Sequence, residues 1–164
     1  MTLPTLVLAS ASPRRLALLA QIGIVPDQVV SPDIDESPLR DEVPRQHALR
    51  LARAKAASVT TADSFVLAAD TVVAAGRRIL PKAENESEAR RCLTFLSGRR
   101  HRVLTGVVLR APDGRCGERL VQSVVGFARL TERQIDAYLA SDEWRGKAGG
   151  YAIQGRAAAF TRFL

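Results

Sequence analysis

Asp70 is the only charged residue in an apolar run over residues 65–75. This run is short, rich in β-branched residues and bounded by Asp63, Ser64 and Gly76, which is typical of a buried strand. A carboxylate inside such a strand is costly unless a cation, a metal or hydrogen bonds accept it. The position therefore favours a carboxylate that activates water or holds a metal. A structural aspartate that caps a turn is the alternative.

A second candidate is the segment Ser10-Ala-Ser-Pro-Arg-Arg15. It follows an expected strand at residues 6–9 and opens a helix with Ser12 as N-cap and Pro13 at the first helical position. Free backbone N–H groups and the helix dipole favour an anion there, and Arg14 and Arg15 could add bidentate phosphate contacts. A capped helix with exposed arginines remains the other interpretation.

Acidic and basic candidates follow in the next two segments. Asp33, Asp35 and Glu36 lie in a loop between two prolines, and such carboxylates suit a hard cation such as Mg²⁺, although loop acids are often only solvated. Residues 44–58 predict an amphipathic helix that places Lys55 on its apolar face, beside Ala48. A lysine there requires an anionic partner, unless it extends to solvent at the rim of that face.

The glycine-rich segment 146–155 is the last candidate. Its glycine spacing permits a close backbone approach to a ligand, and the Gln154 amide could pair with the N3–H and O4 edge of uracil or thymine. The glycine pattern by itself is weakly specific. His47 and His101 lack metal-ligand spacing and are expected to be structural. Cys92 and Cys116 are isolated and are expected to be structurally neutral.

Composition restricts the partners. The net charge of +7 favours an anionic partner such as a nucleotide, whereas only 5% of residues are aromatic, so a base-stacking platform for nucleic acid is not expected. No apolar stretch reaches about 18 residues, so no membrane association is expected. The first ten residues lack the basic start of a signal peptide, which favours a cytoplasmic protein.

The element order predicts the fold class. Strands are expected at 6–9, 25–30, 65–75, 102–110 and 118–127, and helices at 13–22, 44–58, 86–96 and 132–140. Residues 1–164 are expected to form a single domain, because no repeat or linker interrupts the chain. The alternation of strands and helices predicts an α/β domain with a mixed sheet.

These motifs together resemble the Maf family of nucleoside triphosphate pyrophosphatases. The segments that carry the resemblance are Ser10-Ala-Ser-Pro-Arg-Arg15, Ala68-Ala-Asp-Thr-Val72, Leu96-Ser-Gly98 with His101 and Thr105-Gly106, and Lys147-Ala-Gly-Gly-Tyr-Ala-Ile-Gln-Gly155. They keep the family's order and cover nearly the whole chain. The resemblance implies an elongated mixed β-sheet with flanking helices, similar to inosine triphosphate pyrophosphatases, a divalent cation (Mg²⁺ or Mn²⁺) and a possible homodimer.

The resemblance also implies roles for particular residues. Asp70 matches the catalytic base, and Glu36 and Asp70 are expected to hold the metal. The expected substrate- and phosphate-binding residues are Ser10, Arg14, Arg15, Lys55, Lys82 and Lys147. Arg14, Thr71 and Gln154 match the specificity positions of the branch that resembles dTTP/UTP pyrophosphatases.

The expected function is thus metal-assisted hydrolysis of dTTP and UTP to the monophosphate and pyrophosphate. The alternatives are the same reaction on 7-methyl-GTP or another modified nucleotide, or a non-catalytic nucleotide-binding regulator of septum formation. Members of this family typically continue beyond the position of Leu164, so the resemblance also implies a chain that is short at its C-terminus.

Overall fold

The structure is a computed structural model that describes residues 5–164, and residues 1–4 of the N-terminal segment lie outside the described part. The chain groups into two units. Unit 1 contains the described residues up to Asp70 together with Thr105–Val121, and unit 2 contains Thr71–Leu104 and Gln122–Leu164. Three strands, β3, β5 and β6, have residues in both units.

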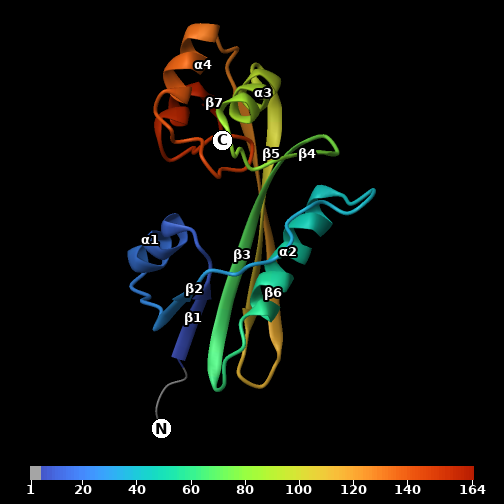
Figure 1. Ribbon diagram of the computed structural model, residues 1–164, viewed down its shortest axis with the longest axis vertical. Coiled ribbons are helices and arrows are strands. Elements are labelled where there is room, and N and C mark those ends of the chain that lie inside the picture. Colours follow the sequence, from blue (N-terminus) through green and yellow to red (C-terminus); the bar gives the residue numbers. More distant parts are fainter. Residues whose placement is uncertain (1–4) are drawn as a thin grey trace. The chain divides into compact units, whose positions relative to one another are not determined.

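Unit 1 is built around a parallel group of strands (Figure 1). Its elements are β1 (Thr5–Ala9), α1 (Pro13–Gln21), β2 (Gln28–Val30), α2 (Pro44–Ser58) and parts of β3 (Ser64–Ala75), β5 (Arg100–Arg110) and β6 (Cys116–Phe127). Strand β1 lies between β2 and β3 and is parallel to both, with Ala9 opposite Val30 and Ala68. Parallel pairing requires crossover connections, which α1 and the segment containing α2 provide.

The core of unit 1 forms where α2 packs on the strands. Ala52 and Ala56 of α2 and Val59 beyond it are buried with apolar side chains of β1, β3 and β5. Small residues on the helix allow a close approach to the sheet. The backbones come close at Gly106 of β5, where an added Cβ would lie 2.5 Å from the carbonyl oxygen of Ala48. The glycine is therefore required by packing.

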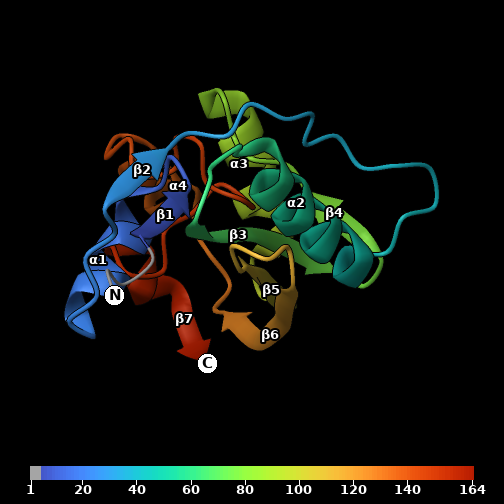
Figure 2. The same cartoon turned by 90° about the horizontal axis from the view of Figure 1, so that it is seen from below.

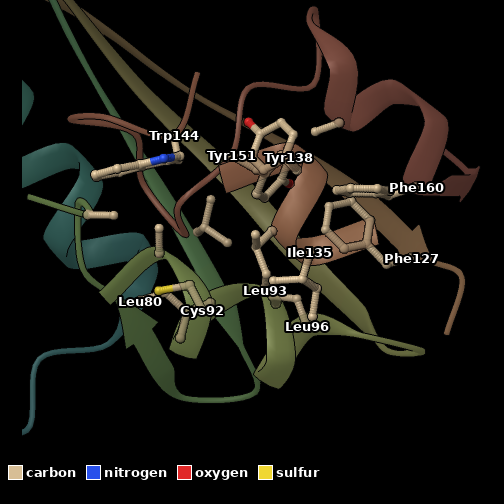
Figure 3. Packing of buried hydrophobic residues seen from close by; sticks show 14 of the residues in the cluster. Leu80, Cys92, Leu93, Leu96, Phe127, Ile135, Tyr138, Trp144, Tyr151 and Phe160 are labelled. Carbon is tan, nitrogen blue, oxygen red and sulfur yellow. The ribbon is translucent and has the colours of Figure 1, made fainter. Parts of the chain in front are cut away.

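Unit 2 has its own core. Its further elements are β4 (Arg78–Leu80), α3 (Glu86–Leu96), α4 (Glu132–Leu139), the 3₁₀ helix η1 (Arg156–Phe160) and β7 (Thr161–Phe163). Figure 3 shows Leu93 of α3 and Ile135 of α4 in one apolar cluster with Phe127 and Phe160. The rings of Phe127 and Phe160 meet edge to face, with centroids 5.9 Å apart. This geometry is favourable for aromatic pairs.

The predicted α/β class with a mixed sheet is confirmed. Within residues 5–164, seven strands form one sheet in the order β2-β1-β3-β5-β6-β7, with β4 paired to β3. The antiparallel β3–β4 and β6–β7 pairs make the sheet mixed. None of the helices within the described residues is long and apolar enough to cross a membrane.

Several predicted boundaries need correction. The strand expected at 25–30 is restricted to Gln28–Val30, because Pro26 lacks an N–H for strand pairing. Strands β4 and β7 and the helix η1 were not predicted. Each strand has only three residues, so neither shows a hydrophobic period. Helix α1 begins at Pro13 as expected, but none of its residues is buried.

The close approach at Gly106 generates a test. We expect Gly106→Ala to lower the free energy of unfolding by about 1–3 kcal/mol, because the added methyl group overpacks the α2–β5 contact. Gly117→Ala in β6 is the matched control, since a Cβ there would meet no atom within 4 Å. Urea unfolding followed by circular dichroism measures both variants. Equal stability of the two variants would contradict the packing requirement.

Candidate active site

The centre of the candidate site is a buried lysine between two carboxylates. Lys55 Nζ lies 2.5 Å from Asp70 Oδ1 and 2.6 Å from Glu36 Oε1. The side chains of Lys55 and Asp70 are 7% and 2% exposed, whereas that of Glu36 is 33% exposed. Lys55 is thus on the buried face of α2, as predicted, and its anionic partners are Asp70 and Glu36. The alternative of a lysine that extends to solvent is wrong.

The register between β1 and β3 brings the segment that begins at Ser10 close to Asp70. Strand β1 ends at Ala9 opposite Ala68, and β3 continues to Asp70, just beyond the end of this pairing. Ser10 immediately follows β1 and is 2% exposed. Ser10 and Asp70 therefore lie near the carboxyl end of β1, where open α/β sheets bind their ligands.

Ser10 and Arg15 form the second part of the site. Ser10 Oγ accepts hydrogen bonds from Arg15 Nη1 at 2.9 Å and from the backbone N–H of Ser12 at 3.1 Å. Arg15 is half-buried, and its partial loss of solvent lowers the pKa of its guanidinium, while the negative charges of Asp70 and Glu36 act in the opposite direction. Arg15 is thus held by Ser10 where it interacts electrostatically with both carboxylates. Arg14, one residue earlier on α1, is exposed.

The acids in the loop before α2 are not equivalent. Glu36 contacts Lys55, whereas Asp33 and Asp35 are exposed. Asp35 Oδ1 accepts the backbone N–H of Ser37 at 2.9 Å, and the hydrogen bonds from Ser37 lower the pKa of Asp35. Asp35 thus stabilises the loop, and Glu36 alone of these three acids contacts Lys55.

Glu36 and Asp70 fit a divalent cation in their chemistry. Lys55 brings one oxygen of each carboxylate to a common point, and Mg²⁺ is commonly held by one or two carboxylates together with substrate phosphates. Among residues 5–164, no group of three or more His, Cys, Asp or Glu side chains could hold a metal ion. A cation held by Glu36 and Asp70 would therefore need further oxygen ligands, which substrate phosphates could supply.

Unit 2 holds the other candidates, beginning with two lysines on paired segments. Lys82 and Ala148 form an antiparallel bridge, and the backbone N–H of Ala83 donates to the carbonyl of Lys147 at 3.2 Å. Gly149 and Gly150 continue this segment with φ of 68° and 70°. An added Cβ on Gly149 would lie 2.8 Å from the side chain of Val73. These glycines therefore allow the Lys147 segment to pack closely on unit 2.

Two tyrosines fix the segment between Lys147 and Gln154. The Tyr138 hydroxyl accepts the backbone N–H of Ala152 at 2.9 Å. The Tyr151 hydroxyl lies 2.7 Å from Nε2 of His101, and Figure 3 shows Tyr138 and Tyr151 close together. These anchors were not predicted as part of a site, because Tyr138 resembles an ordinary apolar position of α4. Gln154 lies exposed in the following turn.

The site residues predicted from the sequence are divided between the units. In unit 1, the contacts and electrostatic interactions described above join Ser10, Arg15, Glu36, Lys55 and Asp70, and Arg14 is the neighbour of Arg15. Thr71 follows Asp70 directly in β3 and belongs to unit 2 with Lys82, Lys147 and Gln154. The functional roles of all these residues stay predictions.

The fold defines the general class, an α/β protein with a buried acid–lysine centre beside a parallel strand pair. A HAM1 protein from Coxiella burnetii has a similar solved structure, with a TM-score of 0.50 and 17% identity. The similarity covers 93% of this chain and 89% of that one, and at this identity it concerns the fold alone.

Sequence comparison then gives the family. The family described as "Maf-like protein" matches residues 5–163, and this chain belongs to the Maf family. A protein of Caulobacter vibrioides named "dTTP/UTP pyrophosphatase" is 63% identical over 159 residues, covering 96% of this chain and 82% of the relative. A relative of the same name from Rhodospirillum rubrum is 62% identical, covering 97% of this chain and 77% of the relative.

The Lys55–Asp70 pair generates a stability prediction. We expect Lys55→Met to lower the free energy of unfolding by about 3 kcal/mol, because it leaves the buried Asp70 carboxylate without its cation. The double variant Lys55→Met/Asp70→Asn should lose less than the sum of the two single variants. Urea unfolding measures the cycle, with Arg53→Met on the exposed face of α2 as control. Strict additivity would contradict direct coupling.

His101 generates a pH prediction for unit 2. Burial lowers the pKa of His101 to about 4, so the unfolded chain binds this proton more readily than the folded chain does. The stability that the neutral His101 side chain contributes is therefore present above about pH 6.5. As the pH falls toward 4, the free energy of unfolding decreases by up to about 3 kcal/mol. His101→Gln should show a weaker decline than the unsubstituted protein when urea unfolding is compared at pH 7 and 4.5. Parallel declines would contradict this prediction.

Proposed function

We propose that this chain hydrolyses dTTP and UTP between the α- and β-phosphates, releasing the nucleoside monophosphate and pyrophosphate. The observation that carries the proposal is the buried Lys55 between Asp70 and Glu36, with Arg15 in the field of both carboxylates. The names of the relatives from Caulobacter vibrioides and Rhodospirillum rubrum support the same activity and substrates.

Asp70 acts as the general base in this proposal. Its carboxylate orients a water molecule and accepts a proton as the water oxygen bonds to the α-phosphorus. The bond from that phosphorus to the bridging oxygen then breaks, and the electron pair leaves with pyrophosphate. Lys55 fixes the orientation of Asp70, because its ammonium is 2.5 Å from Oδ1. A base held in this way needs little reorganisation before reaction.

The basic residues neutralise the triphosphate. Arg15 is already oriented by Ser10, and a planar guanidinium suits bidentate contact with phosphate oxygens. Arg14, Lys82 and Lys147 supply further positive charge, and with Lys55 and Arg15 they stabilise the charge that develops on the leaving pyrophosphate.

Glu36 and Asp70 would hold the divalent cation, Mg²⁺ or Mn²⁺. When bound, such a cation withdraws charge from phosphate oxygens and helps to orient the substrate. The exposed third of the Glu36 side chain is suited to this role, because an entering metal–nucleotide complex can reach it from solvent. Lys55 keeps the two carboxylates together before the complex enters.

Thr71 and Gln154, together with Arg14, determine the preference for pyrimidines in this proposal. An amide offers one donor and one acceptor side by side, which matches the N3–H and O4 of uracil and thymine. The anchored segment around Tyr151 supports this role, because a fixed backbone limits the positions that Gln154 can adopt.

We also propose a cytoplasmic location, where nucleoside triphosphates are available, and a homodimer.

Pyrophosphate release is the direct test. The purified protein should release pyrophosphate from dTTP and UTP with Mg²⁺ or Mn²⁺, and much less from CTP, GTP and 7-methyl-GTP. Asp70→Asn should lower kcat by about 10²-fold or more, because the amide cannot accept the proton. Asp113→Asn, in the exposed hairpin of unit 1, is the matched control and should keep its activity. A folded, fully active Asp70→Asn protein would refute the assignment of the base.

A further inference from the structure

Glu42 is a buried carboxylate outside the set of residues proposed for catalysis. Its side chain is 5% exposed and accepts four hydrogen bonds from the loop and from α2. Arg50 donates two of them, Nε to Oε1 at 2.6 Å and Nη2 to Oε2 at 2.9 Å. His47 Nδ1 donates a third to Oε2 at 2.8 Å, and the backbone N–H of Leu39 donates the fourth at 3.0 Å.

Arg50 also contacts the loop directly. Its Nη2 donates to the backbone carbonyl of Ser37 at 2.9 Å. We call Glu42 and Arg50 the Glu42–Arg50 clamp, because together they hold Ser37 and Leu39 against α2. No hydrophobic period in the sequence indicates this clamp. The side chain of Arg50 is 30% exposed.

The clamp is adjacent to the candidate active site in two directions. In the loop, Ser37 directly follows Glu36. On α2, Arg50 of the clamp and Lys55, which contacts Glu36, belong to the same helix. Figure 2 shows the connection from β2 to α2 as a long loop, and no helix or strand is assigned between Val30 and Pro44. Beside the backbone hydrogen bond from Glu42 to Leu39, side-chain hydrogen bonds such as those of the clamp hold this loop.

The opposite charges of Glu42 and Arg50 strengthen the contact that holds the loop on α2. The bidentate hydrogen bond from Arg50 lowers the pKa of Glu42 to about 2, so its carboxylate is ionised at any working pH. Charge-assisted, two-point hydrogen bonds are stronger and more specific in geometry than single neutral ones. The loop backbone next to Glu36 is thus fixed by a contact that neutral pH does not disrupt.

We propose that Glu42 and Arg50 are positioning residues that hold the loop so that the Glu36 carboxylate stays beside Lys55 and Asp70. The inference rests on the proposed function, in which Glu36 and Asp70 hold the divalent cation. Residues that orient a metal ligand typically affect metal affinity or activity by about 10–100-fold when they are replaced. Neither clamp residue touches substrate or the reacting atoms in this proposal.

Arg50→Lys is the decisive variant. A lysine keeps the positive charge but lacks the planar fork that reaches both Glu42 oxygens and Ser37. The chain offers a matched control one helical turn away, because Arg53 makes an equivalent bidentate pair with Glu118, at 2.7 and 2.6 Å, on an exposed face. Arg53→Lys removes the same kind of fork without touching the loop. Glu42→Gln is a second variant of the clamp.

Hydrogen–deuterium exchange measures the loop without any metal or substrate. In Arg50→Lys, peptides covering residues 31–41 should exchange at least several-fold faster, while α2 peptides keep their protection. Arg53→Lys should leave loop exchange unchanged. Unchanged loop exchange in both Arg50→Lys and Glu42→Gln would overturn the proposal, since the clamp would then not hold the loop.

Mn²⁺ titration links the loop to the site. Electron paramagnetic resonance of free Mn²⁺ measures binding directly, and pyrophosphate release at increasing Mn²⁺ gives the half-saturating concentration. We expect about a ten-fold weaker Mn²⁺ interaction in Arg50→Lys and no change in Arg53→Lys. A normal Mn²⁺ interaction in Arg50→Lys would overturn the link to Glu36. An unsubstituted protein that binds Mn²⁺ but releases no pyrophosphate would refute the proposed function alone.

Discussion

The buried contact of Lys55 with Asp70 and Glu36 is the constraint on which unit 1 depends. Desolvation of a carboxylate at the centre of a sheet is unfavourable by several kcal/mol unless a cation compensates for it. Lys55 provides that cation, so the buried carboxylate of Asp70 depends on Lys55 for its compensating charge. The contact requires α2 to lie on β3 with Lys55 facing inward, and it requires the loop before α2 to return to the same point.

Packing in unit 1 follows from this requirement. Helix α2 packs on the sheet through Ala52 and Ala56, and β5 has Gly106 where an added Cβ would clash with the helix backbone. Larger side chains at these positions would move the helix outward and separate Lys55 from Asp70. The small residues are thus linked to the charge pair, because the reach of one lysine side chain limits the distance between helix and strand.

The sequence was most informative where one element determined the environment of a residue. The apolar run around Asp70 and the periodicity of residues 44–58 each placed a charge on a buried face, and both placements are confirmed. Glu42 was missed because its partners come from a loop backbone and from Arg50, which no hydrophobic period brings together. Strands β4 and β7 were missed because three residues contain too little pattern to distinguish a strand from a loop.

The use of a lysine at position 55 and an arginine at position 50 of α2 has a physical explanation. Only Lys55, Lys82 and Lys147 among 24 basic residues are lysines. An ammonium carries all its donors on one atom, so two carboxylates can converge on Lys55 from different directions, whereas a guanidinium spreads its donors across a plane. Arg50 uses that plane to hold both Glu42 oxygens and the Ser37 carbonyl. The two side chains on α2 thus have different roles. Lys55 brings the Asp70 and Glu36 carboxylates together, and Arg50 holds the loop backbone that places Glu36 beside Lys55.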